Sequence, residues 1–293
     1  MNNAILCVQE YLDQAQQPVT GLQVELVFVG DTEPHKHRKD QLLYVIRGLI
    51  TVQTEQGLWT VPPHCAIWIP GQVMHFARAT SQASVANLYM EPQQHRAGLA
   101  QCGILFAQPL LRELILRLVH PAESSVESRI RETRLVSVLM DELEAAPWEP
   151  LHLPIPTERR LRRLVDVLTE KPGLKLSMEQ WGALIGVSNR TLSRLFLRET
   201  GMSFGRWLQQ WDIRLALQKL ASGESVTNIA IDLGYESLSA FITMFRRTLG
   251  TTPTRYLAGV QTLPARKSEQ AFIHMDGRIP EVFTKIHVPT IRA

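Results

Sequence analysis

Three histidines and a glutamine in the first third of the chain have residue types and a spacing that could bind a ligand. His35, His37 and Gln41 form a His-x-His-x3-Gln run, and His75 follows soon after Ile69–Pro70–Gly71. Imidazole nitrogens and an amide oxygen can coordinate a divalent cation, although without the negative charge of a carboxylate. Three interpretations stay open. His35, His37 and His75 bind a metal, or all four side chains hydrogen-bond a small-molecule effector, or they are satisfied within their own domain.

The segments around these residues read as short β-strands separated by turns. Residues 22–29, 41–47, 49–54, 58–61, 66–69 and 84–90 are rich in Val, Ile, Leu, Tyr and Trp, and Arg47–Gly48 and Gln56–Gly57 are turn signals. Regularly spaced short strands favour an all-β sandwich or barrel, and a barrel of this size can hold one small ligand. The aromatic residues expected beside the histidines, or else in plain core packing, are Tyr44, Trp59, Trp68 and Phe76.

The spacing of the histidines resembles the two motifs of the cupin barrel. The first is Gly30-x4-His35-x-His37-x3-Gln41-x6-Gly48, and the second is Ile69–Pro70–Gly71-x3-His75. In cupins the His-x-His pair and the third His converge on a metal, so the resemblance implies an effector-binding barrel over residues 1–100. The chain departs from the pattern at Gln41, where cupins have Glu, and at Gln72, where they have Gly.

Two helices are expected after the strands. Residues 104–120 carry a helical pattern of apolar residues that stops at Pro121. Residues 128–145 place Leu135, Leu139 and Leu143 at i+4 steps. This stripe either packs on the barrel or forms half of a dimer seam, and residues 101–150 are expected to make the contact of a homodimer.

The proline-rich segment from Pro147 to Pro156 separates two differently charged parts of the chain. It reads as an extended interdomain linker, after which Thr157 can cap the next helix. That helix opens with a basic face of Arg159, Arg160, Arg162 and Arg163, which is either a solvated surface or a phosphate contact.

A repeat between residues 176 and 257 organises the second half. Gly182-x3-Gly186 and Phe196-x-Arg-x2-Gly-x-Ser correspond to Ala230-x3-Gly234 and Phe245-x-Arg-x2-Gly-x-Thr, 48 or 49 residues later. The small residue permits a close crossing of two helices, and the Gly lies past a helix end where a left-handed backbone is needed. Each copy therefore has the layout of a helix-turn-helix unit.

Serines mark the expected helix starts in both copies. Ser177 with Gln180 forms a capping-box pattern, and the other expected N-cap residues are Ser188, Ser203, Ser225 and Ser237. The helix after Ser203 spans about 28 Å at 1.5 Å per residue, close to the ~34 Å between successive major-groove faces. Two recognition helices on this rod could enter adjacent turns of one duplex.

The stretches GVSNRTLSRLFLRETGMSF and VTNIAIDLGYESLSAFITMFRRTLGTTPTRYL resemble the DNA-binding domain of the AraC/XylS family of transcription regulators. The resemblance implies an all-α domain over residues 151–259, with promoter DNA and RNA polymerase as partners. It places these residues at the DNA: Asn189, Arg190, Ser193 and Arg194 in the first unit, and Leu238, Ser239, Ala240, Thr243, Arg246 and Arg247 in the second. Arginine can read guanine edges, so the first helix is expected to carry more of the specificity.

The distribution of charge agrees with an anionic partner for one half only. Residues 1–156 hold 11 Lys or Arg and 16 Asp or Glu, a net −5, whereas residues 157–259 hold 15 and 9, a net +6. Cys7, Cys65 and Cys102 are odd in number and widely spaced, which is typical of a reducing cytosol. No signal pattern or apolar run of about 20 residues is present, so we expect a cytoplasmic protein that joins the nucleoid when bound to DNA and has no membrane partner.

The sequence thus predicts a multidomain chain, with an N-terminal all-β cupin barrel and a C-terminal all-α tandem helix-turn-helix domain. The expected function is sequence-specific transcription regulation, as an activator or a repressor, controlled by an effector in the barrel. The alternative is a metal-dependent cupin enzyme with an accessory DNA-binding module. Gln41 in place of Glu, and the absence of any further catalytic constellation, argue against an enzyme. Residues 260–293 are expected to form a weakly ordered tail.

Overall fold

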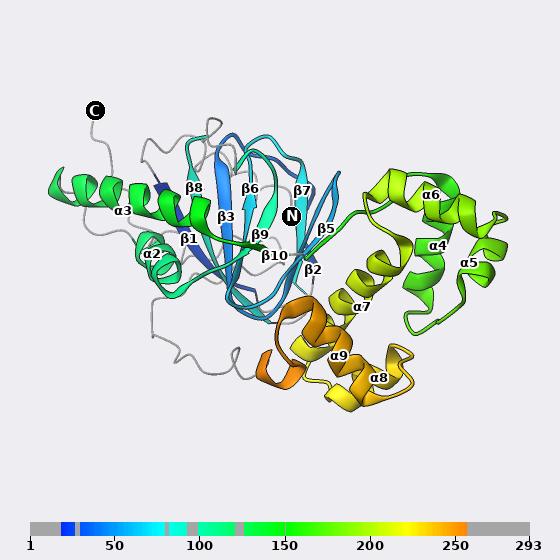
Figure 1. The fold of residues 1–293 in the computed structure, drawn as a ribbon. Coiled ribbons are helices and arrows are strands. Elements are labelled where there is room, and N and C mark those ends of the chain that lie inside the picture. The colour runs from blue at the N-terminus through cyan, green and yellow to red at the C-terminus, as the bar shows by residue number, and fades with distance from the viewer. Residues whose placement is uncertain are drawn as a thin grey trace. The chain divides into compact units, whose positions relative to one another are not determined.

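A computed structural model describes residues 19–26, 30–79, 82–92, 99–120, 126–149 and 151–256 of the 293-residue chain. The expectations for Cys7 and for the tail over 260–293 lie outside these residues. The chain divides into two compact units (Figure 1). We name them the β unit, built on residues up to Thr54 and on Val61–Glu149, and the helical unit, built on Glu55–Thr60 and Pro150–Leu263.

Two antiparallel sheets form the strand-rich part of the chain. The first has the order β1-β8-β3-β6-β9-β10 and the second the order β11-β5-β4-β7-β2. The strands are β1 (Val19–Leu26), β2 (Gly30–Asp31), β3 (Asp40–Arg47), β4 (Ile50–Thr54), β5 (Gly57–Val61), β6 (Cys65–Ile69), β7 (His75–Ala79), β8 (Ala83–Met90), β9 (Gly103–Phe106), β10 (Trp148–Glu149) and β11 (His152–Leu153). The predicted all-β character is confirmed, and β2, β7, β9, β10 and β11 are additions to the predicted strands.

Strand β9 corrects the helix predicted over residues 104–120. Residues 103–106 pair with β6 in an antiparallel ladder, and the helix α2 begins only at Pro109 and ends at Val119. A β-carbon on Gly103 would lie 2.1 Å from the ring of Trp148, so β9 needs glycine where this side chain of the neighbouring strand β10 lies against it. The apolar residues 104–106 fit a buried strand as well as a helix, because periodicity cannot separate the two over so short a run.

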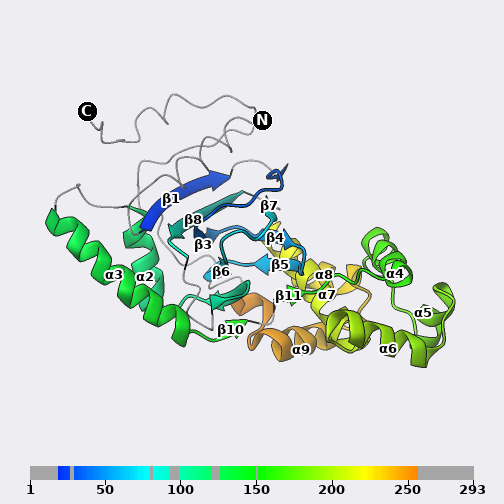
Figure 2. The same ribbon diagram turned by 90° about the horizontal axis from the view of Figure 1, so that it is seen from above.

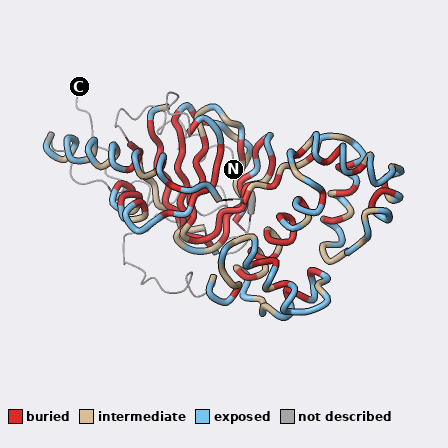
Figure 3. The backbone as a smooth tube through the Cα atoms, viewed as in Figure 1, coloured by how far each residue is buried: buried red, intermediate tan, exposed pale blue. Residues whose placement is uncertain are grey.

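The second core of the β unit lies on the face of the first sheet covered by α2 and α3 (Val126–Ala145) (Figure 2). Alternate strand residues point to opposite faces, so Leu42, Tyr44, Trp68 and Leu88 lie in this core with helix residues such as Leu139. The C-terminal half of α3 is therefore packed on the sheet side, whereas its N-terminal half is largely exposed (Figure 3).

The segment predicted as an extended linker contains two short strands. β10 pairs with β9, and β11 pairs with β5 within the helical unit. Further along, the carbonyl of Pro154 accepts a hydrogen bond of 2.7 Å from the indole nitrogen of Trp207, and Leu153 lies in the helical core. Much of the segment is therefore hydrogen-bonded structure rather than a free tether.

The helical unit contains α4 (Arg159–Glu170), α5 (Met178–Leu184), α6 (Asn189–Thr200), α7 (Phe204–Ala221), α8 (Val226–Asp232) and α9 (Leu238–Leu249). In Figure 1, α7 runs from the group α4–α6 to the pair α8 and α9. Its 18 residues correspond to about 27 Å. The aromatic side chains Trp181, Phe196, Phe204, Trp207 and Trp211 are buried around the first half of α7, so α6 packs against the same core as α4 and α5.

Candidate nucleic-acid interface and histidine cluster

Helix α6 is defined by a serine at its start and a glycine at its end. Ser188 Oγ accepts a hydrogen bond from the backbone N–H of Thr191 at 3.3 Å, and Gly201 ends the helix with φ +67°. Leu192, Leu195 and Phe196 are buried on one face. That packing leaves Arg190 and Arg194, four residues apart, on the exposed face, where both could reach the same stretch of a groove.

Helix α9 repeats this design with other side chains. Ser237 Oγ accepts from the backbone N–H of Ala240 at 3.1 Å, and Gly250 ends the helix with φ +72°. Phe241, Met244 and Phe245 are buried, and the predicted N-caps Ser177, Ser203 and Ser225 also accept hydrogen bonds at their helix starts.

Every residue predicted to face DNA is exposed: Asn189, Arg190, Ser193, Arg194, Leu238, Ser239, Ala240, Thr243, Arg246 and Arg247. Within the described part of the chain, no side-chain hydrogen bond or ion pair engages the four arginines of this set. They are therefore available for phosphate or base contacts. The assignment of these residues to the DNA contact stays a prediction.

The sequence interpretation missed Leu197 on the exposed face of α6. This side chain is 58% exposed and lies three and seven residues beyond Arg194 and Arg190. The signal available in the sequence was a leucine outside the buried stripe of Leu192, Leu195 and Phe196. A large apolar group in this position could contact thymine methyl groups or sugars.

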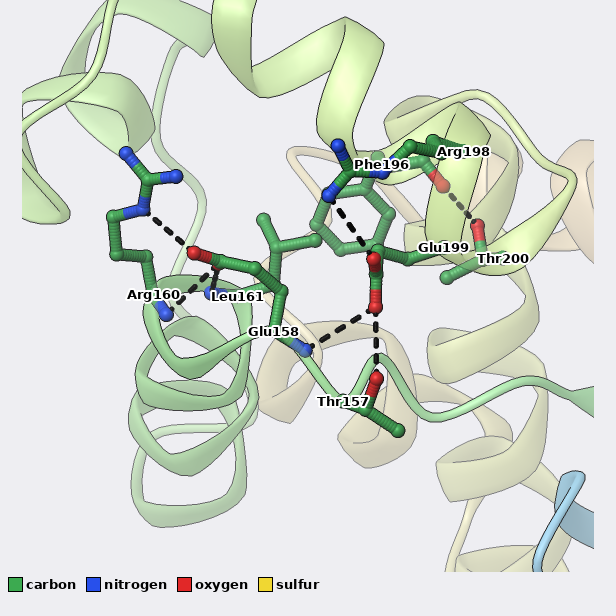
Figure 4. Close-up of polar contacts among 8 residues, drawn as sticks. All are labelled: Thr157, Glu158, Arg160, Leu161, Phe196, Arg198, Glu199 and Thr200. Atoms are coloured by element: carbon green, nitrogen blue, oxygen red, sulfur yellow. Dashed lines mark hydrogen bonds and ion pairs between the residues drawn. The ribbon is translucent and has the colours of Figure 1, made fainter.

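The C-terminal end of α6 is bonded to the start of α4 (Figure 4). Glu199 Oε2 accepts hydrogen bonds from the Thr157 hydroxyl at 2.9 Å and from the backbone N–H of Glu158 at 3.2 Å. The bond from Thr157, followed by the one from Arg198, holds the pKa of Glu199 below its usual value.

The predicted cap of α4 was wrong by one residue. Glu158, rather than Thr157, accepts from the backbone N–H groups of Arg160 and Leu161, at 2.9 and 3.0 Å. The hydroxyl of Thr157 is instead directed to Glu199, a long-range partner that the local sequence does not reveal (Figure 4).

In the β unit, the three predicted histidines lie together. The ring centroids are 4.4 Å apart for His35 and His75, 5.1 Å for His37 and His75, and 6.2 Å for His35 and His37. The backbones of His35 and His75 exchange two hydrogen bonds of 2.9 Å, which bring these distant residues side by side.

The Nδ1 atom of each ring donates to a backbone carbonyl two residues away. The distances are 2.8 Å from His35 to Glu33, 2.5 Å from His37 to Lys39, and 2.9 Å from His75 to Val73. Since a carbonyl only accepts, each Nδ1 carries a proton. Burial lowers the pKa of His35, and it lowers that of His75 to about 3, so both rings are neutral near pH 7 and each Nε2 has a lone pair.

Gln41 joins His37 to two residues that were not predicted. Its Oε1 lies 3.0 Å from His37 Nε2, and its Nε2 donates to Asn87 Oδ1 at 2.8 Å and to Tyr89 Oη at 3.2 Å. His37 is thus bonded at both ring nitrogens, whereas Nε2 of His35 and of His75 has no hydrogen-bond partner among the described residues. Asn87 was detectable as the one amide in the apolar run 84–90.

The aromatic neighbour of the histidines is Tyr89, whose ring is 5.3 Å from that of His37. Tyr44 and Trp68 point to the other face of the sheet, into the core beneath α2 and α3, and Trp59 stacks on His152 at 3.9 Å. Asp40 also stays outside the cluster and accepts from the backbone N–H of Gly71 at 2.7 Å. As the side chains stand, the described residues contain no group of three or more His, Cys, Asp or Glu positioned to hold a metal ion.

Comparison with known proteins relates both units to described families. Residues 181–259 match the family described as a helix-turn-helix domain, and residues 25–146 match the family described as an AraC-like ligand binding domain. The HTH-type transcriptional regulator NimR of Escherichia coli is 39% identical over 80% of this chain and 85% of its own length.

Two further similarities are weaker. The HTH-type transcriptional regulator RipA of Corynebacterium glutamicum is 35% identical over 36% of this chain and 32% of its own length. The solved structure of ToxT from Vibrio cholerae is 10% identical, with a TM-score of 0.35, and the match covers 83% of this chain and 98% of that one. Among the described helices, none is long and apolar enough to cross a membrane.

Proposed function

The chain belongs to the AraC family of transcriptional regulators, and on that premise we propose that α6 and α9 both enter the major groove of one promoter duplex. The supporting observation is the repeated design of two serine-capped helices, each burying one stripe and exposing the other, at the two ends of α7. Neither exposed face carries a carboxylate between its first residue and its last turn, so both suit an anionic surface. The protein would then be a cytoplasmic regulator that joins the nucleoid when bound to DNA.

The test starts from the operator, which can be selected from a pool of random duplexes with the full-length protein. A bidentate Arg–guanine pair discriminates by about 1–3 kcal/mol. Arg190→Ala and Arg194→Ala should therefore weaken cognate binding roughly ten- to hundredfold and relax the preference at one or two base pairs. Ser239→Ala and Thr243→Ala should lose less. Base-specific losses confined to the α9 variants would contradict the greater role given to α6.

We further propose that the histidine cluster is the polar end of the effector site, with His35, His37, Gln41 and His75 as its contacts. Since Nε2 of His35 and of His75 carries a lone pair, the group that faces them must be a hydrogen-bond donor or a cation. The effector is then a small molecule with an N–H or O–H group at one end. Leu43, Val45 and Val85 alternate with the core residues along their strands and would line its apolar part.

A thermal-shift screen of small molecules can test this proposal. Compounds that raise the midpoint of wild-type protein should lose that effect on His75→Phe, which keeps a ring of similar size but removes the lone pair. His120→Phe, a change at a histidine outside the cluster, serves as the control and should respond like wild type. If all hits stabilise His75→Phe as well, the cluster is not the effector site.

A divalent cation is the second candidate occupant. The hydrogen bonds from all three Nδ1 atoms to backbone carbonyls are the arrangement that orients metal-binding histidines. His35 and His75 would hold the ion through Nε2, and His37 would join them once its Nε2 is released from Gln41 Oε1, and the ion would supply positive charge for an anionic effector group. Elemental analysis of purified protein should find one divalent ion per chain, reduced in His37→Phe. Metal-free wild type that also leaves the visible spectrum of added Co²⁺ unchanged would exclude this candidate.

We propose that the protein is a homodimer that uses the exposed face of α3. Ile130 and Val138 are 50% and 42% exposed on this helix, while Leu139 and Leu143 are buried against the sheet. Sedimentation should show a dimer for wild type and a shift to monomer for Ile130→Asp. Arg131→Asp, at the exposed neighbouring position, is the control for added negative charge. A monomeric wild type at micromolar concentration would rule the dimer out.

We also propose RNA polymerase as a partner, contacted through α8. Ile231 is 66% exposed on this scaffold helix, which lies outside the predicted recognition faces. In transcription with purified polymerase, Ile231→Asp should abolish the effect of the protein on its promoter and leave operator affinity unchanged. An unchanged transcript level in this variant would remove α8 from the contact.

A further inference from the structure

A buried carboxylate lies in the middle of α7, the helix that joins the two helix-turn-helix units. Asp212 is 3% exposed. Its Oδ2 accepts a hydrogen bond of 2.6 Å from Lys175 Nζ and one of 2.7 Å from Tyr235 Oη. Burying a carboxylate costs desolvation free energy, which hydrogen bonds and an opposite charge offset. The three groups therefore depend on one another and act as one polar contact. We call Lys175, Asp212 and Tyr235 the Asp212 junction.

The partners of Asp212 come from distant parts of the helical unit. Lys175 lies in the segment between α4 and α5, ahead of the first helix-turn-helix unit, and Tyr235 lies in the turn between α8 and α9 of the second. Lys175 Nζ also lies 4.9 Å from the centroid of the Tyr235 ring. That ring contacts Phe241 of α9 edge to face at 5.5 Å, and Phe241 is fully buried. The junction therefore reaches the second recognition helix through one aromatic contact.

Beside this junction, the backbone of the turn between α8 and α9 touches the segment between α4 and α5. A β-carbon on Gly234 would lie 2.3 Å from the carbonyl oxygen of Gly173, and one on Gly173 would lie 2.2 Å from that of Asp232. The equivalent glycine of the first repeat, Gly186, has nothing within 4 Å of its β-carbon position. The second repeat is thus held laterally to the segment that leads into the first repeat, as well as being connected to it through α7.

We propose that Asp212 is a positioning residue that fixes the separation and relative rotation of α6 and α9, and so sets the half-site spacing that the protein accepts on DNA. This inference rests on the proposed entry of both helices into one duplex. A helix of about 27 Å can bend gently along its length, so α7 alone does not fix the angle between the units at its two ends. The lateral contact removes that freedom because it connects the second unit to the segment that leads into α5 of the first.

The charges around Asp212 support this role. Burial raises the pKa of its carboxyl, and the ammonium of Lys175 and the hydrogen bonds from Lys175 and Tyr235 act in the opposite direction. The junction is thus a compact set of mutually dependent groups, in which the loss of one leaves the others poorly satisfied. The nearby contacts of Lys219 with Glu224 and Asp232 join only the end of α7 to α8 and do not include the first unit.

The experiment measures spacing preference rather than affinity alone. Full-length wild type, Tyr235→Phe and Asp212→Asn are titrated against the selected operator and against versions with one base pair added or removed between the half-sites. One base pair changes the separation by about 3.4 Å and the rotation by about 35°. Wild type should bind the altered spacings roughly tenfold or more weakly, since one recognition helix loses its base contacts. In both variants the penalty should fall to about threefold or less.

Tyr235→Phe retains the aromatic packing on Phe241 and removes only the hydroxyl, so it keeps the test valid if Asp212→Asn folds poorly. Lys219→Met, which breaks the contacts at the end of α7, is the matched control and should keep the wild-type penalty. A merely structural role for Asp212 would weaken binding to all three spacings alike.

Two adverse results are distinguishable. An unchanged spacing penalty in folded Tyr235→Phe and Asp212→Asn overturns the positioning role while leaving two-helix binding intact. Wild type that tolerates every spacing equally overturns two-helix binding itself, and the role of Asp212 with it.

Discussion

Single side chains differ between the two recognition helices more than their shared design suggests. α6 exposes Arg190 and Arg194 in its first half, whereas α9 exposes Ser239 and Thr243 there and has Arg246 and Arg247 only in its last turn. Cations in the last turn of a helix whose start enters the groove face the phosphates at its rim. We therefore expect Arg190 and Arg194 to determine base preference, and Arg246 and Arg247 to contribute affinity for any DNA sequence.

Arg246→Ala and Arg247→Ala should weaken binding to every sequence by a similar factor. Each removes one phosphate contact, so the slope of log affinity against log salt concentration should flatten by about one unit per residue. The measurement is a titration of each variant on the operator and on an unrelated duplex at several salt concentrations, with Arg194→Ala as the comparison. A loss confined to the operator would assign these residues to base contacts instead.

The carboxylate of Glu199 gives a pH-dependent contribution to stability. The hydrogen bond from Thr157, and then that from Arg198, depress its pKa below the ordinary 4.5. A depressed carboxyl pKa stabilises the fold above that ordinary value, and the contribution is lost as the pH falls through the folded-state pKa. Thr157→Val should raise the pKa of Glu199 and reduce the pH dependence of unfolding below about pH 5.

Carbon-detected NMR of the glutamate carboxyls can follow the titration of Glu199 in wild type and in Thr157→Val. Thr169→Val, on the outer side of α4, is the control. An identical midpoint in Thr157→Val and wild type would show that the hydroxyl does not set the pKa.

At the level of elements, the turns of the two helix-turn-helix units have the same backbone conformation but different surroundings. Gly186 and Gly234 both adopt φ +71° after the first helix of their unit, as the repeat predicts. Only the turn of the second unit packs against another backbone, at Gly173. The turn at Gly186 is thus constrained only by its own backbone conformation, whereas the turn at Gly234 is also constrained by contact with Gly173.

Alanine at these two glycines should separate conformation from contact. Gly186→Ala should lower the free energy of unfolding by about 1–2 kcal/mol, because alanine is strained in the left-handed conformation. Gly234→Ala should lower it by the same amount and by a further ~1–3 kcal/mol, because the new β-carbon overlaps the Gly173 carbonyl. Chemical denaturation of both variants measures the difference. Equal losses would mean that the two backbones separate at little cost.

At the scale of the whole molecule, the described residues include two separate hydrophobic cores. Leu139 lies in the core between the first sheet and α2 and α3, and Phe196 lies in the core around α7. The two clusters share no residue. Their stabilities are therefore expected to respond separately to substitution and to ligands.

Scanning calorimetry can check this separation. Leu139→Ala should cost about 2–5 kcal/mol and Phe196→Ala about 3–5 kcal/mol, each in its own transition. Operator DNA at one hundred times its Kd should add about 2.7 kcal/mol to the transition that Phe196→Ala lowers. A duplex that raises the transition lowered by Leu139→Ala to the same extent would show that the units unfold as one.

The sequence by itself determined the features that depend on a few neighbouring residues. The serine caps, the left-handed glycines and the buried stripes of α6 and α9 are each decided within about one helical turn, so the tandem repeat and the all-α half followed directly. The histidine spacing likewise predicted the side chains that lie together in the β unit, although not what they bind.

Only the tertiary structure decided contacts between residues far apart in the chain. Asp212 meets Lys175 from 37 positions away, Gln41 meets Asn87 from 46, and Glu199 meets Thr157 from 42. The strand β9 and the face on which Tyr44 and Trp68 lie also depended on partners elsewhere, because apolar residues suit a helix, a strand or either side of a sheet equally well. Local patterns fix the elements, whereas their register and packing depend on which distant surfaces meet.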